Sequence, residues 1–373
     1  SYSTINLTLD GVKVMNILPK FFIRKNSNRI KQKADLSIIH KNRKSYNITV
    51  IAFLTIILII GVLMSISIGS TKIPLSDILS ALKQGDQTLN TYRIIKFVRI
   101  PRTVAAVLAG CAFSVSGVIL QSVLNNSLAS PSVIGVNSGA GLFTVLIAAF
   151  FPTCFSLTTI AAFTGAIIAV LIVYFIAHKT GASRMGIVLS GVAVSSFIGA
   201  ITDTVLTLKP DSIIARTAFL IGGFAGITMD KLAFAGLLIV LAIFITMILS
   251  YDMNILALGE DTSKSLGLKV VAYRFIFLIL AAVLAGSAIS FAGLIGFVGL
   301  IIPHVSRLVV GYDNRILIPV SALLGSVFTL FCDLLARVLF APYEIPVGII
   351  LSFLGGPFFI YLLIKGKRGQ LYD

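Results

Sequence analysis

The sequence predicts an all-α polytopic membrane protein with ten transmembrane helices. Of its 373 residues, 57% are hydrophobic and only 12% are charged, and the mean hydropathy is +1.02. A water-soluble domain carries about 25% charged residues. Ten separate segments also reach the length of about 20 apolar residues that a helix needs to cross a bilayer. These observations exclude a soluble globular class, and no stretch of mixed polarity is long enough to build a separate soluble domain.

The expected spans follow from the apolar segments in chain order. They are 48–68, 103–124, 132–151, 157–177, 186–207, 232–250, 270–289, 291–310, 315–338 and 346–364. The apolar stretch 270–310 is too long for one span, so we divide it near 286–293, where small residues permit a tight reversal. Residues 213–227 are too short to cross and contain Arg216, which predicts a short outer helix followed by a turn.

Charge divides the chain into a basic N-terminal tail (1–47), a ten-helix transmembrane domain (48–366) and a short C-terminal tail (367–373). Basic residues in short loops favour the cytoplasmic side, which predicts that both tails are cytoplasmic. The N-terminal tail lacks the apolar core of a signal peptide, and its basic residues are expected to attract anionic membrane lipid. The net charge of +16 does not indicate a nucleic-acid partner, because the basic residues lie between apolar spans.

The loop 69–102 departs from this pattern. It should lie outside, yet it carries six basic residues against Asp77 and Asp86. Either this loop is long enough that the preference of basic residues for the cytoplasmic side does not apply to it, or its cations have an external partner.

Charged residues within or near the spans are few. Asp333 and Arg337 lie four residues apart, so they share a helix face and can pair; Asp203 and Glu344 are the other acidic candidates. Such groups are costly in lipid and are functional candidates. The alternative is equally weighted: Asp333 and Arg337 pair for structural reasons, and Asp203 and Glu344 lie at the hydrated interface.

No enzymatic or metal centre is visible in the sequence. It has no phosphate-binding loop and no HExxH pattern. The histidines and cysteines are not grouped at metal-ligand spacing; they are His40, His178, His304, Cys111, Cys154 and Cys332. The segment 255–269 (ILALGEDTSKSLGLK) predicts a short amphipathic helix, which either docks into a groove of another protein or lies on the bilayer.

Several blocks of sequence resemble one known family. They are RIPRTVAAVLAG (99–110), SGVILQSVLNNSLASPSVIGVNSGA (116–140), ALGEDTSKSLGL (257–268), GLIGFVGLIIPHVSRLVVG (293–311), LLGSVFTLFCDLLAR (323–337) and EIPVGIILSFLGGPFFIYLL (344–363). Together they resemble the FecCD-type permeases of bacterial ABC importers for ferric siderophores, haem and cobalamin. The resemblance covers about residues 50–366 and implies the ten-helix fold of a type II ABC importer permease.

The resemblance also implies a division of labour. The chain would be a transport subunit and not an enzyme, without a cofactor of its own, and two cytoplasmic ABC ATPase subunits would bind ATP and magnesium. A second permease subunit, identical or homologous, would complete the pathway. An external substrate-binding protein would deliver the cargo, and its acidic residues would meet external arginines. The positions that match those arginines are Arg99, Arg102 and Arg337.

Two further sets of residues follow from the resemblance. The segment that couples to the ATPase matches Gly259, Glu260, Leu266 and Gly267, within 255–269. The cytoplasmic gate matches Asn126, Leu128, Ala182 and Ser183. The chain departs from the family at two of these places: relatives usually carry proline where it has Ser127, and often a hydroxyl where it has Ala182.

The expected cargo is a ferric siderophore, with haem or cobalamin as the alternatives. A secondary transporter driven by an ion gradient is a more remote alternative, since it should carry acidic residues near mid-membrane. The expected location is the bacterial cytoplasmic membrane.

Overall fold

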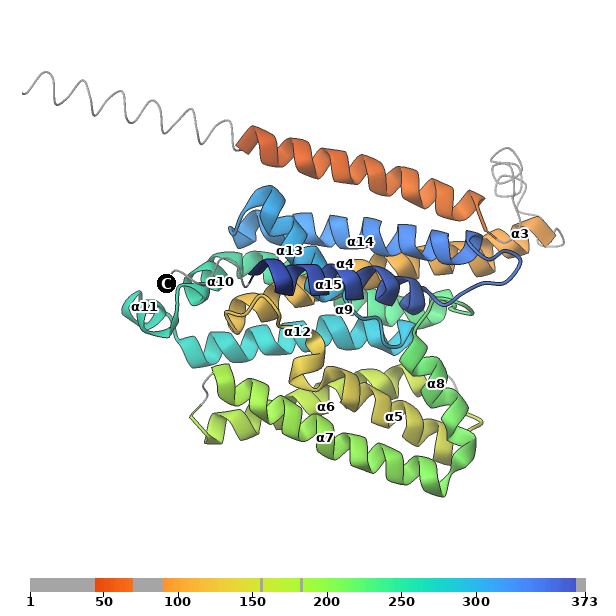
Figure 1. The fold of residues 1–373 in the computed structure, drawn as a ribbon, viewed down its shortest axis with the longest axis horizontal. Helices are drawn as coiled ribbons and strands as arrows, with labels where there is room; N and C mark the ends of the chain where they lie inside the picture. Colours follow the sequence, from red (N-terminus) through yellow and green to blue (C-terminus); the bar gives the residue numbers. More distant parts are fainter. Residues whose placement is uncertain (1–43, 70–89, 155–156, 182–183, 367–373) are drawn as a thin grey trace, which may run out of the picture. The chain divides into compact units, whose positions relative to one another are not determined.

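The computed structural model describes residues 44–69, 90–154, 157–181 and 184–366 (Figure 1). The chain divides into two units, 1–52 and 53–373, and all contacts discussed below lie within the second. Every regular element among the described residues is helical. The predicted tails 1–47 and 367–373 lie outside these ranges, except for residues 44–47.

Seven described helices have the length and hydropathy of a membrane span, and three apolar helices are shorter. The seven are Lys44–Ser67, Asn90–Val123, α6 (Leu157–Lys179), α7 (Arg184–Leu208), α9 (Met229–Ile248), α12 (Val270–Ala292) and α14 (Asn314–Val338). The shorter ones are α5 (Val136–Phe150), α13 (Val298–Val310) and the stretch Val347–Tyr361 of α15 (Val347–Gly366). Each predicted span therefore overlaps an apolar helix, and the predicted all-α membrane fold is confirmed, while seven of the ten predicted spans have the length of a full membrane span in the described part of the chain.

Short elements connect these helices. The helix over Asn90–Val123 consists of α3 (Asn90–Ile94), a π-helical turn and α4 (Ile100–Val123). The predicted short helix after α7 is α8 (Ile213–Ile221), and the segment after α9 forms α10 (Ser250–Ala257) and α11 (Glu260–Ser265).

Helix α4 is largely buried and packs against α12, α13 and α14. Glycines allow this close approach: a Cβ on Gly110 would lie 2.2 Å from the carbonyl oxygen of Gly325, and one on Gly117 would lie 1.8 Å from that of Gly299. Lipid provides no hydrophobic drive between helices, so small residues that admit close backbone contact favour their association. The glycines of the second span thus have the packing role expected of a tight bundle.

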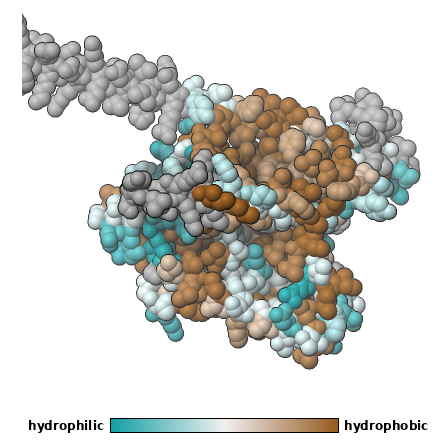
Figure 2. All heavy atoms as spheres, viewed as in Figure 1, coloured by the Kyte–Doolittle hydropathy of each residue, from teal (hydrophilic) through white to brown (hydrophobic). Residues whose placement is uncertain are grey.

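Helices α5, α6 and α7 pack together, and α12 contacts both this group and α4 (Figure 1). Large apolar side chains cover much of the visible surface (Figure 2). More than half of each of the side chains of Phe175, Phe197, Phe234 and Phe244 is exposed. A surface of this kind suits lipid contact and not water.

The sequence predicted the reversal near 286–293, and in the structure the chain reverses later, after Ala292. Helix α12 continues to Ala292, and Gly286 lies inside it, where a Cβ would meet the side chain of Ala166 at 3.0 Å. The chain turns at 293–297, where Gly293 and Phe297 have φ of +70° and +67°. Gly286 therefore serves helix packing, and the backbone change follows it.

Candidate functional site

The structure brings the three predicted docking arginines together with two carboxylates; we call this region the arginine end. Arg102 lies in the first turn of α4, and its Nε donates to Asp333 Oδ1 at 3.0 Å. Arg337, one turn after Asp333 on α14, places Nη2 3.0 Å from Asp333 Oδ2. Arg102 also bonds to Glu344, which precedes α15. The predicted pairing of Asp333 with Arg337 is confirmed, and Arg102 shares the same carboxylate.

Two of these arginines also bind the end of the helix Lys44–Ser67. Arg337 donates to the Ser65 carbonyl at 3.0 Å and to the Ser65 hydroxyl at 2.6 Å. Arg99 donates to the carbonyls of Ile66 and Ser67 at 2.7 and 2.8 Å. The last carbonyls of a helix have no partner within it and carry partial negative charge, so cations stabilise them there.

The guanidinium groups of the arginine end are largely removed from solvent. Arg99, Arg102 and Arg337 are 4%, 6% and 2% exposed, and Asp333 is fully buried, whereas about a third of the Glu344 side chain is exposed. The docking role of the three arginines stays a prediction, and each of them already has partners within the chain. Sequence reasoning missed Ser65, whose only signal was a hydroxyl within an apolar span.

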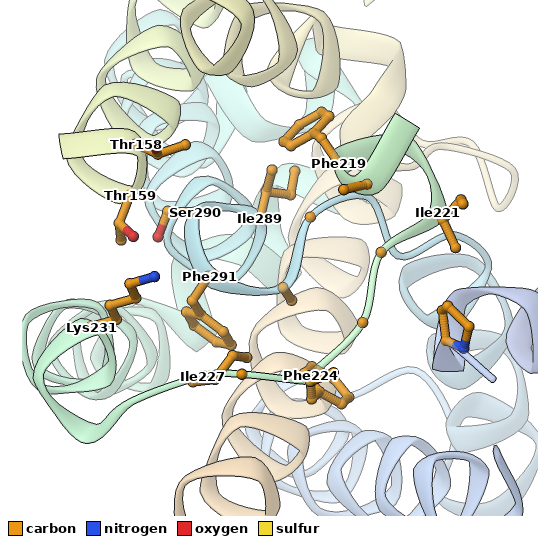
Figure 3. A pocket seen from close by; sticks show the side chains of 18 of the residues that line it. Thr158, Thr159, Phe219, Ile221, Phe224, Ile227, Lys231, Ile289, Ser290 and Phe291 are labelled. Carbon is orange, nitrogen blue, oxygen red and sulfur yellow. The ribbon is translucent and has the colours of Figure 1, made fainter. Parts of the chain in front are cut away.

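A cavity of about 610 Å³ adjoins the arginine end, and Arg102 and Glu344 form part of its wall. Its lining is mostly apolar, from Phe219 on α8 and Phe291 on α12, with Lys231 of α9 pointing inward (Figure 3).

The predicted coupling segment lies at the opposite end of the bundle, beyond the 24 residues of α4, which span about 36 Å. Gly259 and Gly267 flank α11 with φ of +109° and +84°, values that other residues rarely adopt. Leu258 and Leu266 are 61% and 60% exposed. The expectation of a short helix with apolar residues at both ends is confirmed.

Polar contacts hold this segment against the bundle. The Ser263 hydroxyl donates to the carbonyl of Ile255 at 2.7 Å, which joins α11 to α10. Asn254 of α10 donates to Asp313 at 2.9 Å. Hydrogen bonds from Arg315 and then from Asn254 lower the pKa of Asp313 to about 2, so its carboxylate is charged at neutral pH.

Two of the predicted gate residues lie at this same end, in the turn after α4. The Asn126 side chain accepts a hydrogen bond from the backbone N–H of Leu128 at 2.9 Å, and both side chains are exposed. Such a bond closes a turn without a proline, so the loop is ordered although Ser127 replaces the family's proline. Ala182 and Ser183, the other two gate residues, lie outside the described residues.

Within the described part of the chain, no three histidine, cysteine or acidic side chains are grouped so that they could hold a metal ion.

Comparison with known proteins identifies the family. The model of the FecCD transport family matches residues 57–365. The chain belongs to this family.

Relatives within the family include importer permeases for several cargoes. The chain is 34% identical over 88% of its length to the Fe(3+)-citrate import system permease protein YfmD of Bacillus subtilis, of which 98% is covered. It is 36% identical to the iron(3+)-hydroxamate import system permease protein FhuB of the same organism, over 84% of this chain and 82% of FhuB. The cobalamin import system permease protein BtuC of Halobacterium salinarum is 38% identical over 72% of this chain and 73% of its own length.

A solved structure shares the fold. It is an inward-facing conformation of a transporter described as being of the metal-chelate ABC type, with a TM-score of 0.76 and 29% identity. The match covers 85% of this chain and 99% of that one. This FecCD-family chain is thus a multi-pass membrane permease of an ABC importer and works as a transport subunit with other ABC subunits.

Proposed function

We propose that this permease moves a ferric siderophore across the bacterial cytoplasmic membrane. The observation that supports the proposal is the placement of two different groups of residues at opposite ends of one bundle: clustered arginines at one end, and α11 flanked by two exposed leucines at the other. Iron-chelate cargoes in the names of two relatives favour a ferric siderophore. Haem or cobalamin is the second candidate, and the cobalamin relative favours the latter.

The energy source in this proposal is a pair of cytoplasmic ABC ATPase subunits. In this proposal the ATPase subunits bind ATP and magnesium. The sequence of the permease chain itself contains no phosphate-binding loop. The coupling segment 255–269 docks into the ATPase through Leu258 and Leu266, and the positive φ angles at Gly259 and Gly267 set the shape of that contact. This end of the bundle, together with both chain termini, then faces the cytoplasm.

The arginine end meets the external binding protein in this proposal. Charge complementarity steers docking and fixes its register. Because Arg99, Arg102 and Arg337 are already bonded within the chain, an acidic residue of the binding protein has to compete with an internal acceptor. Glu344 is the most accessible of these, since Asp333 is fully buried.

The cytoplasmic gate in this proposal combines the turn of Asn126 and Leu128 with Ala182 and Ser183. A second permease subunit, identical or homologous, supplies the other half of the pathway.

Reconstitution in lipid vesicles tests the proposal. The purified complex is given hydroxamate and catecholate ferric siderophores, haem and cobalamin, each with its candidate binding protein, and uptake is measured. We expect uptake of one ferric siderophore that stops when ATP or the binding protein is omitted. Uptake that does not depend on ATP and follows an ion gradient would contradict the proposal. Uptake of cobalamin or haem alone would show that this compound, and not a ferric siderophore, is the cargo.

A further inference from the structure

A buried arginine joins the coupling helix α11 to the membrane span α12. Glu260 opens α11, and its Oε2 lies 3.1 Å from Nη2 of Arg274, in the second turn of α12. The Arg274 side chain is only 2% exposed, whereas the Glu260 side chain is 39% exposed. The carboxylate thus reaches from a surface helix to a cation inside the bundle.

Side chains from three spans surround Arg274. Tyr174, Ala177 and His178 of α6, Ile187 of α7 and Val271 of α12 surround a small void beside it. Tyr174 stacks on His178 and packs against Phe275 of α12, with ring centroids 5.8 and 4.5 Å apart. A guanidinium held among rings and aliphatic side chains has little freedom to follow a displaced partner.

A second cation, Arg184, also interacts with the Glu260 carboxylate. Arg184, the first residue of α7, interacts electrostatically with both Arg274 and Glu260, and its Nη2 lies 3.5 Å from the carbonyl of Leu256 in α10. Glu260 therefore compensates positive charge at the starts of both α7 and α12. Displacing α11 without these spans would leave a buried guanidinium poorly compensated, which is strongly unfavourable.

We propose that Arg274 is the positioning residue that makes α12 follow the coupling helix α11. The inference rests on the proposed function of segment 255–269 as the ATPase contact. Helix α12 packs against α4, α6 and α9. A movement transmitted through Arg274 therefore reaches both α4, with the helices packed on it, and the group α5, α6 and α7.

The chain offers a matched control. The other carboxylate oxygen of Glu260, Oε1, bonds to Lys264 at 2.9 Å. Lys264 is 57% exposed and lies on α11 itself, so this bond does not leave the helix. Lys264→Gln removes a partner of the same carboxylate without removing the link to α12.

The test uses the complete complex in lipid nanodiscs, with and without Mg-ATP and vanadate. Hydrogen exchange is followed by mass spectrometry in peptides covering 259–268 and 270–278. We expect the wild-type complex to change protection in both peptides when nucleotide binds. In Arg274→Gln the first peptide still responds, while the response of the second falls roughly tenfold, within the range of coupling between residues in contact. Lys264→Gln keeps both responses within about twofold.

Three further variants keep the test decisive if Arg274→Gln does not fold. Arg274→Lys retains the charge and restores part of the α12 response. Glu260→Gln changes a half-exposed side chain and reproduces the loss, and the double variant Glu260→Gln/Arg274→Gln loses no more than either single one. An α12 response that survives Glu260→Gln or Arg274→Gln, or one that Lys264→Gln abolishes equally, overturns the inference. Failure of the wild-type chain to retain any ATPase subunit would instead contradict the proposed function.

Discussion

Asp333 is the carboxylate shared by two buried arginines, Arg102 and Arg337. Asp333→Asn should therefore destabilise the bundle strongly, because it leaves two guanidinium groups without their common counter-charge. Breaking a buried ion pair by removing one partner costs about 3–5 kcal/mol. Thermal unfolding in detergent measures the effect as a lower midpoint.

Asp203→Asn is the control for this substitution. Asp203 pairs with Arg216 at 2.8 Å, but its side chain is 65% exposed. An exposed pair contributes about 1 kcal/mol or less, so the midpoint should change little. Equal losses in the two variants would show that the Asp333 network is not a stabilising centre.

In the proposed function, Glu344 competes with a carboxylate of the external binding protein for Arg102, with which it pairs in this structure. Glu344→Gln keeps the side chain's shape but removes its charge, so Arg102 is less fully compensated. We expect tighter docking of the binding protein, by a few-fold, because charge pairs at an interface act on affinity and association rate. Arg99→Gln should weaken docking while basal ATP hydrolysis persists, since the ion pairs of Asp333 with Arg102 and Arg337 are retained. Binding to the complex in nanodiscs, measured at two salt concentrations, distinguishes these cases; identical affinities for all variants would exclude the arginine end as the docking surface.

The sequence could predict only the local part of these residue contacts. Asp333 and Arg337 are four apart on one helix, so their pairing follows from helical geometry. Arg102 reaches Asp333 across 231 positions of sequence, and Arg337 reaches Ser65 across 272. Such contacts depend on which helices pack together, and spacing within one helix carries no information about that.

At the scale of elements, the shape of the proposed coupling segment 255–269 depends on two glycines, Gly259 and Gly267. Gly267 has a φ of +84°, and no atom lies within 4 Å of the position of an added Cβ. Gly267→Ala therefore acts through backbone strain alone, at about 1–2 kcal/mol for a left-handed residue. We expect the end of α11 to change and less ATPase to co-purify with the permease.

The matched control is Gly199→Ala in α7, which also adds a Cβ in open space but has no positive φ. Alanine is favoured over glycine within a helix, so this variant should retain the ATPase. Full retention of the ATPase by Gly267→Ala would argue that the segment's backbone shape is unimportant for coupling.

Hydropathy predicted where helices lie across the molecule, but not every place where the chain turns. Each predicted apolar run coincides with one of the seven long or three shorter apolar helices, because a backbone in lipid must satisfy its hydrogen bonds internally. Gly286 and Gly293 look alike in the sequence, yet one packs against Ala166 within α12 and the other ends that helix. The difference arises from a neighbouring helix and from backbone dihedral angles, which composition does not encode.

The packing of the whole bundle depends on close contacts along α4. Gly117→Ala places a Cβ 1.8 Å from the carbonyl oxygen of Gly299 on α13, so the two helices must separate. Because α12 and α14 also pack against α4, the shift cannot stay local. We expect a loss of about 1–3 kcal/mol or more, typical of overpacking in a dense interior. It would be measured as a lower unfolding midpoint and a smaller yield of monodisperse protein. Gly356→Ala in α15, where no atom lies within 4 Å, should leave both unchanged; the same loss in both variants would mean that the α4 contacts are not what limits the fold.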